Sequence, residues 1–409
     1  MKITSTHKFF DTLLLTLLVF SGGGLLFVFN RNLFSVILFL VALFTIVFMG
    51  KQIKKSIFHA SLFTLVGFSF LILLNYIVVP AGQIFLKYGF HLMNITSCVL
   101  IFTHFKNNRN QEYFLDRMRY ILKIILYFSI INFLSYFIVK SQLKDLYGGY
   151  NNDFIAQTYN YLFFFDVEKN TFNFFGIELV RNQGWFWEPG INQVYLNILL
   201  YLEGFIFKRG KWTIPLIVFA IITTYSTTGI FIMIIVLFFI FLKSIKKNPV
   251  LYILLGLFIA YPLYYLAKSN FENKSVENAS SMNKRIFDLV QPLSIAADNP
   301  ITGIGLDLEH FQRYRSEHHQ QEWIQNLVIM ETTEKGSSNS ITFLIAATGI
   351  PVSFFLLYCF FTQSLFTYRK KIFLIIIIIS AMSEPLLLRP FFLILIISGM
   401  FRLFHKFTK

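Results

Sequence analysis

The stretch R181-N-Q-G-W-F-W-E-P-G190 lies directly before an apolar run at residues 191–207. It places Arg181 and Glu188 beside two tryptophans, at the point where a membrane helix is expected to begin. Ionisable groups in such a position cost free energy unless they serve a purpose. This polar stretch and the charged segment 268–340 are therefore the first candidates for function, and the apolar runs around them decide the fold.

The composition is that of a membrane protein. Of the 409 residues, 56% are hydrophobic, and the mean hydropathy of +0.61 exceeds what one soluble core could bury. A membrane span needs about 20 mostly apolar residues. The sequence predicts an all-α, polytopic single membrane domain over residues 1–409, with about twelve spans at 9–29, 33–50, 57–79, 89–105, 120–139, 191–207, 212–226, 229–242, 249–267, 341–361, 372–388 and 390–404.

The distribution of charge predicts the topology. Lys and Arg concentrate in cytoplasmic loops of membrane proteins, and here they dominate every second connection, at residues 51–55, 106–119, 208–211, 243–247 and 369–371. The acids gather in the alternate connections. We therefore expect both termini in the cytoplasm, with a first external loop at 140–190 and a large, helical external loop at 268–340. The net charge of +15 then reflects topology, and no nucleic-acid partner is needed to explain it.

Several smaller features predict structure alone. The first apolar run is long and lacks a small-residue cleavage site, so we expect a retained signal anchor. Cys98 and Cys359 fall inside apolar runs and are expected to be buried free thiols. Asp11 and His91 are lone polar groups near predicted helix ends, where snorkelling or capping explains them. No metal-ligand spacing stands out, and we expect neither a metal nor a cofactor.

The external segment from Lys140 to Arg181 is rich in Tyr, Phe and Asn. Aromatic rings beside amide side chains suit carbohydrate, because rings stack on sugar faces and amides bind hydroxyls. An aromatic belt at the membrane interface explains the rings equally well. Within the polar stretch, the planar guanidinium of Arg181 suits a pair of phosphate oxygens. Glu188 could orient Arg181, accept a proton, or simply neutralise Arg181 at the interface.

The large loop is expected to contain two helices. Residues 306–316 place acids early and arginines late, as a helix dipole favours. His310 and Arg313 would share one face, whereas Leu308, Phe311 and Arg315 would lie on another and pack the loop on the membrane domain as a lid.

The other predicted helix follows Arg285, where apolar residues at 286, 289, 290 and 293 have amphipathic helix spacing. Pro292 should bend or interrupt this helix. The sequence D298-N-P-I-T-G-I-G305 then predicts a turn, in which Gly303 and Gly305 allow close backbone approach.

The order R-x-x-G-x-x-x-E-P-G before a membrane helix resembles the Arg-Gly-Pro motif of the bacterial O-antigen polymerase and ligase superfamily, the Wzy and WaaL type. S281-M-N-K-R285 resembles the Ser/Arg element of that family's large external loop, and D298-N-P-I-T-G-I-G305 resembles its Asn-Pro-x-x-Gly-x-Gly element. The run from Ser337 to Pro351 resembles the segment entering the following helix, where members often carry His-Asn. This chain has Ser338-Asn339 instead, so the proposed base histidine of ligases has no counterpart at that position.

The resemblance implies a GT-C-like glycosyltransferase, in the bacterial inner membrane, with a periplasmic active site. It would polymerise oligosaccharide repeat units carried on undecaprenyl pyrophosphate, which serve as donor and acceptor, with membrane lipid and a chain-length regulator protein as further partners. Arginines would stabilise the departing pyrophosphate, and Glu188 or a loop histidine would take the acceptor proton. The candidate catalytic residues are Arg181, Glu188, Arg285, His310, His318 and His319; the candidate substrate-binding residues are Arg313, Arg315, Gly184, Trp187 and Asn339.

Two other functions fit the sequence. An O-antigen ligase, which transfers finished glycan to the lipid A core, uses the same chemistry. A polysaccharide flippase or other transporter belongs to a different class. Transporters usually place charges inside mid-membrane helices, whereas here the charges gather in two external segments, which favours an enzyme at an external face.

Overall fold

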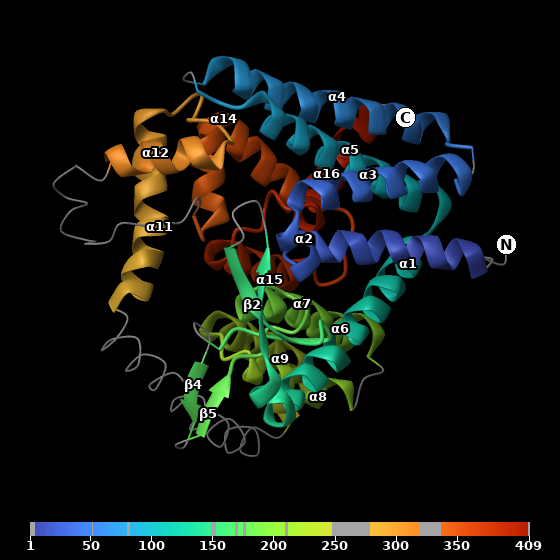
Figure 1. Cartoon of the computed structure of the whole chain (residues 1–409). Coiled ribbons are helices and arrows are strands. Elements are labelled where there is room, and N and C mark those ends of the chain that lie inside the picture. Colours follow the sequence, from blue (N-terminus) through green and yellow to red (C-terminus); the bar gives the residue numbers. More distant parts are fainter. Residues whose placement is uncertain are drawn as a thin grey trace. The chain divides into compact units, whose positions relative to one another are not determined.

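The computed structural model is mostly helical (Figure 1). It describes residues 5–50, 52–79, 82–148, 153–167, 171–174, 177–208, 212–247, 279–318 and 337–407. The chain divides into two compact units. The first comprises Met1–Ile121, Asn283–Thr367 and Ala381–Lys409, and the second comprises Leu122–Met282 and Tyr368–Ser380.

Helices form most of both units. The first unit is built from α1 (Ser5–Phe20), α2 (Leu25–Phe29), α3 (Arg31–Phe48), α4 (Lys55–Val78), α5 (Phe85–Asn108), α12 (Leu308–His318), α14 (Ser340–Phe361) and α16 (Pro390–Phe407), with most of α11 (Ala279–Asp298). The second contains α7 (Pro189–Tyr201), the π-helix η2 (Leu202–Phe207), α8 (Thr213–Thr223), α9 (Thr227–Lys247) and most of α15 (Lys370–Ser383). Helix α6 (Gln111–Val139) belongs to both.

Six described helices are long and apolar enough to cross a membrane: α3, α4, α5, α6 with the 3-10 turn after it, α14 and α16. The chain is therefore a multi-pass membrane protein, whereas the predicted number of twelve spans is not confirmed. The span predicted at 9–29 is broken into α1 and α2, because Gly23 adopts a φ of 133°. Helices α8 and α9 are shorter apolar helices by the same measure. The span predicted at 249–267 lies outside the described residues.

The segment 140–190, predicted to be the first external loop, contains strands, which the all-α prediction did not include. β1 (Lys144–Gly148), β2 (Asp153–Tyr159) and β3 (Phe163–Phe165) form an antiparallel sheet, and β4 (Thr171–Phe174) pairs with β5 (Ile177–Val180). The buried side chain of Asn132 in α6 binds the backbone N–H and C=O of Phe164 at 3.0 and 3.1 Å. The side-chain amide of Asn132 thus pairs with Phe164 as a neighbouring strand would. The edge strand β3, with its aromatic residues, therefore packs on α6.

Helix α14 is broken at Gly349, which adopts φ 76° and ψ 167°. Pro351 has no N–H for the carbonyl of Ala347, and the N–H of Ile350 turns away to the carbonyl of Pro300 at 2.7 Å. Two carbonyls in the middle of a membrane helix thereby lose their helical donors. Because an unpaired backbone carbonyl is costly inside a bilayer, other donors must replace them.

The segment 298–305 supplies those donors. The N–H of Ile304 bonds to the carbonyl of Ala346, and that of Gly305 to the carbonyl of Ala347, both at 2.9 Å. Asn75 of α4 also donates its amide to Ala347, at 3.0 Å. Gly303 and Gly305 have φ of 65° and 96°, so the close approach predicted from the sequence is confirmed. The Asn-Pro-x-x-Gly-x-Gly element and the residues Gly349, Ile350 and Pro351 therefore form the two halves of one backbone junction.

This junction predicts that Gly349→Ala destabilises the protein. A Cβ at Gly349 would lie 2.2 Å from the carbonyl oxygen of Ile301, and the backbone conformation is open only to glycine, at a cost of about 1–3 kcal/mol for strain alone. The matched control is Gly89→Ala in α5, where a Cβ meets nothing within 4 Å and Ala favours the helix by about 1 kcal/mol. Thermal unfolding in detergent should rank Gly89→Ala at or above the natural protein and Gly349→Ala well below it.

Asp11 is not the interfacial lone group that the sequence predicted. It is buried, and its carboxylate accepts hydrogen bonds from Arg109 at 2.7 Å and Tyr113 at 2.9 Å. The imidazole of His104 lies 2.7 Å from the same carboxylate. The partners are distant in sequence, so no local pattern indicated them. The network joins α1 to α5 and to the start of α6.

Asp307 ties the large loop to the start of α5. Its carboxylate accepts hydrogen bonds from Lys87 at 2.6 Å and from the backbone N–H of Glu309 at 2.9 Å and Ile84 at 3.3 Å. Burial alone would raise the pKa of Asp307. The hydrogen bonds and the positive charge of Lys87 outweigh burial and hold that pKa below its ordinary value.

The lowered pKa predicts an acid-sensitive loop. Because the folded state holds the Asp307 proton less tightly than the unfolded chain does, its stabilisation is complete above the unfolded pKa of about 4 and is lost as pH falls further. Asp307→Asn should lower the unfolding midpoint at pH 7 and flatten the midpoint's dependence on pH below about 4. An equally steep acid dependence in Asp307→Asn would contradict this assignment.

Candidate functional site

The polar stretch 181–190 forms a tight turn in the second unit, held by the break between α8 and α9. The Nε of Arg181 donates to the carbonyl of Thr224 at 3.0 Å. The N–H of Asn182 donates to the carbonyl of Thr223, and its side-chain amide to the Thr223 hydroxyl, both at 2.9 Å. The two carbonyls at the C-terminal end of α8 thus fix the backbone and the arginine together.

Gly184 is required where the turn approaches α6. It has a φ of 57°, and a Cβ there would lie 2.6 Å from the hydroxyl of Ser129. That hydroxyl donates to the side chain of Asn192 in α7. The ring of Trp185 stacks on Phe128 at 3.9 Å between centroids. Gly184 therefore has a backbone role in the structure, and its predicted contact with substrate stays a prediction.

Glu188 is the N-cap residue of α7 but does not cap it with its side chain, and Pro189 occupies the first turn. Arg181, Trp187 and Glu188 are all partly exposed, whereas every residue of α7 is buried. The turn thus presents one cationic, one aromatic and one acidic side chain at the start of a helix that is otherwise enclosed.

Gln183 is an exception among the buried amides of the turn. It is 0% exposed, and neither its Oε1 nor its Nε2 has a hydrogen-bond partner among the described residues. A buried unpaired amide costs about 1–3 kcal/mol. Gln363, equally buried, is fully engaged: it accepts from the N–H groups of Leu365 and Phe366 and donates to the carbonyl of Phe366.

The contrast predicts opposite effects of one substitution. Gln183→Met should leave the free energy of unfolding unchanged or raise it by about 1 kcal/mol, because it removes only unpaired polar atoms. Gln363→Met should lower it by about 1–3 kcal/mol, because it leaves three backbone groups unpaired. Thermal unfolding of the two purified variants measures the difference. Equal losses in both would show that Gln183 has a partner.

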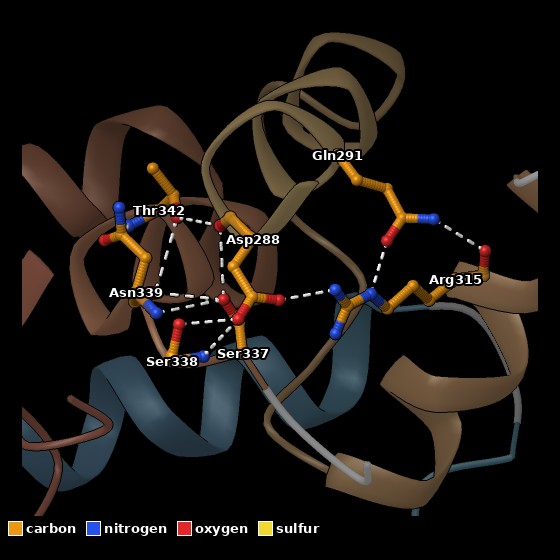
Figure 2. Close-up of polar contacts among 7 residues, drawn as sticks. All are labelled: Asp288, Gln291, Arg315, Ser337, Ser338, Asn339 and Thr342. Carbon is orange, nitrogen blue, oxygen red and sulfur yellow. Dashed lines mark hydrogen bonds and ion pairs between the residues drawn. The ribbon is translucent and has the colours of Figure 1, made fainter. Parts of the chain in front are cut away.

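The large loop is fixed by a buried ion pair in the first unit. Arg315 of α12 donates to Asp288 of α11 at 2.5 Å, and also to the amide oxygen of Gln291. Arg315 and Asp288 are 2% and 1% exposed, and the guanidinium lies 4.4 Å from the Phe287 ring centroid. Figure 2 shows Asp288 between Arg315 and residues 337–339. A pair so enclosed is costly to break, about 3–5 kcal/mol when one partner is removed.

Asp288 also closes the end of the loop. Its second carboxylate oxygen accepts from the N–H of Ser338 at 2.9 Å and from the Ser338 hydroxyl at 2.5 Å. Helix α11 runs through Pro292 without interruption, contrary to one of the outcomes that the sequence predicted. The proline removes the donor to the Asp288 carbonyl, which accepts instead from Ser337 at 3.2 Å and Thr342 at 3.0 Å.

The predicted loop residues differ in exposure. Arg285 and Arg313 are exposed, His310 is half-buried beside Gly82 and Tyr314, and Arg315 is enclosed as described. His318 ends α12 but its side chain lies outside the description, as does all of His319.

Two further expectations for the loop can be compared with the structure. Phe311 packs on Phe343 of α14 at 4.9 Å, so the predicted packing of α12 on a membrane helix is confirmed. Asn339 is the N-cap of α14 and accepts from the N–H groups of Ile341 and Thr342. Its predicted contact with substrate is not tested by this contact.

The structure brings the predicted residues together in two groups. Arg181, Gly184, Trp187 and Glu188 lie in the second unit, whereas Arg285, His310, Arg313, Arg315 and Asn339 lie in the first. Sequence reasoning missed Asp288, Gln291 and Gln183. Only Asp288 carried a signal, because it lies four residues before Pro292, where a helical carbonyl is left without its donor. Among the described residues, no group of three His, Cys, Asp or Glu side chains could hold a metal ion.

A comparison with known protein families gives a match over part of the chain. The family described as O-antigen ligase matches residues 212–357, which include α8, α9, α11, α12 and most of α14. No curated protein and no solved structure matches the chain. The matched region contains the Asp288–Arg315 pair and the junction at Gly349, while the turn 181–190 precedes it. This match supports the O-antigen polymerase and ligase superfamily of membrane glycan transferases for the chain.

Proposed function

We propose that the protein polymerises oligosaccharide repeat units carried on undecaprenyl pyrophosphate, at the periplasmic face of the bacterial inner membrane. An acceptor hydroxyl oxygen bonds to the anomeric carbon of the donor, and the bond from that carbon to the pyrophosphate oxygen breaks. Undecaprenyl pyrophosphate leaves, and the hydroxyl proton passes to a base, for which Glu188 and His310 are the described candidates. The donor is already activated, so the reaction consumes no nucleotide sugar.

One observation supports this proposal most strongly. Arg285 is exposed on α11, one turn before the buried Asp288 that fixes this helix. Leu289 and Leu293 are exposed one and two turns further along and therefore share the face of Arg285. A cation followed by an apolar stripe matches a pyrophosphate followed by a polyprenyl chain, since the guanidinium pairs with phosphate oxygens and leucines pack on the chain.

The arginines then have different roles. Arg285 is exposed in the loop and is the arginine proposed to neutralise charge on the leaving pyrophosphate. Arg315 is a positioning residue, because its guanidinium donates hydrogen bonds to Asp288 and Gln291.

The corner around Ser338 favours a polymerase over a ligase. At the position where related ligases carry their proposed base, this chain has Ser338, whose hydroxyl donates to Asp288. Asp288 is itself paired with Arg315. Both groups serve to close the loop, so a proton acceptor has to come from elsewhere, and a ligase of the related type would lack its base.

A deletion strain tests the function. The expected lipopolysaccharide profile is a single repeat unit on the core, because transfer to the core continues without polymerisation. Long unligated chains would indicate a ligase instead, and absence of repeat units from the outer face would indicate a flippase.

Arg285 and Arg315 give a matched pair of variants. Arg285→Ala should lower the rate of polymerisation by about 100-fold or more, so that no long polymer forms. The unfolding midpoint of this variant should be unchanged. Arg315→Ala should lower the free energy of unfolding by about 3–5 kcal/mol, because Asp288 is left buried and unpaired. Polymer length is measured in the deletion strain that carries each variant, and the free energy of unfolding is measured on the purified variants. Normal polymer in Arg285→Ala would contradict the pyrophosphate role.

A further inference from the structure

The first turns of α6 hold an arginine against two tyrosine rings. The Cζ of Arg117 lies 5.7 Å from the ring centroid of Tyr113 and 5.5 Å from that of Tyr120. Cation–π contacts of this kind restrict a side chain that is otherwise free to rotate. The guanidinium of Arg117 is therefore held in one place, near the start of a helix long and apolar enough to cross the membrane.

Tyr113 is itself fixed by the buried network at Asp11. The Tyr113 hydroxyl donates to the Asp11 carboxylate at 2.9 Å, and the Cζ of Arg109 lies 5.5 Å from the Tyr113 ring centroid. Asp11 is 1% exposed and also accepts from the Nε of Arg109 at 2.7 Å. The network that joins α1, α5 and α6 thus sets the position of the Tyr113 ring and, through that ring, the position of Arg117.

Arg117 has donors that the protein does not use. Among the described residues, its Nη2 donates to Asp116 at 2.9 Å, whereas its buried Nε has no hydrogen-bond partner. Asp116 is the preceding residue and its side chain is 42% exposed, so this ion pair contributes little. The Arg117 side chain is 24% exposed, and a guanidinium carries five N–H donors. Arg117 can therefore bind a further anion.

An exposed apolar stripe begins one turn after Arg117. Large side chains recur on α6 every three or four residues, and those nearest to Arg117 are 41–54% exposed: Tyr120, Ile124, Tyr127 and Ile131. Residues spaced in this way share one helix face, so Arg117 lies at the head of the stripe. A cation at the end of an apolar helix face matches a phospholipid, which carries a phosphate at the end of its acyl chains.

The length of the stripe sets the level of Arg117 in the membrane. The stripe continues to Ile138 and is about 27 Å long, close to the thickness of the hydrocarbon core. The full span, Gln111–Gln142, has 32 residues and is about 48 Å long, so it also crosses the head-group regions. Arg117 lies within the span but before the stripe, which is the level of the lipid phosphates.

We propose that an anionic phospholipid binds along α6, in the leaflet at which this helix begins. Its phosphate pairs with the guanidinium of Arg117, and one acyl chain lies on the stripe from Tyr120 to Ile131, which is about 16 Å long, or about half of the hydrocarbon core. Charge complementarity selects this occupant, because a zwitterionic lipid adds an ammonium group that Arg117 repels and free phosphate has no chain to cover the stripe. The inference does not depend on the proposed polymerase activity.

Site-specific photocrosslinking tests the lipid site. The purified full-length protein carries p-benzoylphenylalanine at Ile124, on the stripe, in nanodiscs with equal amounts of phosphatidylglycerol and phosphatidylcholine that have the same acyl chains. Mass spectrometry gives the ratio of the two lipids among the adducts. The variants are Arg117→Gln and Tyr120→Leu. The matched control is Arg402→Gln in α16, an exposed arginine that donates to the carbonyl of Thr362 at 3.4 Å, because this variant removes the same charge from another helix.

The lipid site predicts a specific pattern of adducts. With the natural Arg117, phosphatidylglycerol should be enriched about five-fold at Ile124, because one cation near an anionic lipid surface favours binding by about that factor. Arg117→Gln should return the ratio to near one. Tyr120→Leu changes an exposed side chain and should lower the ratio about two-fold, because one ring contact of Arg117 is lost. Arg402→Gln and an excess of inorganic phosphate should both leave the ratio unchanged.

Three results would overturn the proposal. Equal loss of the preference in Arg117→Gln and Arg402→Gln, in proteins with unchanged unfolding midpoints, would indicate diffuse attraction by the net charge. A ratio near one with the natural Arg117 would mean that the stripe selects no anionic lipid. Loss of the preference in inorganic phosphate would indicate an anion site that needs no acyl chain.

Discussion

The fold depends on carbonyl groups that lose their helical donors at prolines. Pro351 and Gly349 break α14 inside a membrane span, and the freed carbonyls of Ala346 and Ala347 accept from the loop at residues 304–305. Pro292 has a similar effect on one carbonyl, that of Asp288. This carbonyl accepts instead from the hydroxyl of Ser337, which precedes α14, and from that of Thr342, in the first turn of α14. In each case the unpaired carbonyl is satisfied by another segment, so a local defect in one helix becomes the attachment point of the large loop.

Buried charged side chains then stabilise the attachment of the large loop to α14 and to the start of α5. The Asp288–Arg315 pair closes α11, α12 and the start of α14 around one carboxylate, and Asp307 holds the loop to Lys87. These groups resemble catalytic residues in type, yet their hydrogen-bonding capacity is used within the protein. Arg285, by contrast, is exposed on α11. Exposure, more than residue type, distinguishes Arg285 from the enclosed Arg315.

In the second unit, polar side chains pair with polar groups of irregular segments that lack helical partners. Asn132 acts as a strand partner for Phe164, and Asn182 pairs with the end of α8. Both amides allow irregular backbone to lie beside a membrane helix, because they satisfy the groups that a helix would have paired internally. The chain can thus pack strands against α6 and a tight turn against α8 with these backbone and side-chain polar groups paired.

The sequence by itself determined the membrane class, six of the apolar spans, the packing face of α12 and the close approach at Gly303 and Gly305, because hydropathy, helical period and glycine conformation are local properties. It could not determine that Arg315 is enclosed, that Asp11 binds His104 and Arg109, or that the turn at Gly184 meets the middle of α6. Each of these depends on contacts between residues far apart in the chain. Only tertiary structure decides which polar groups are used up within the protein and which remain for a ligand.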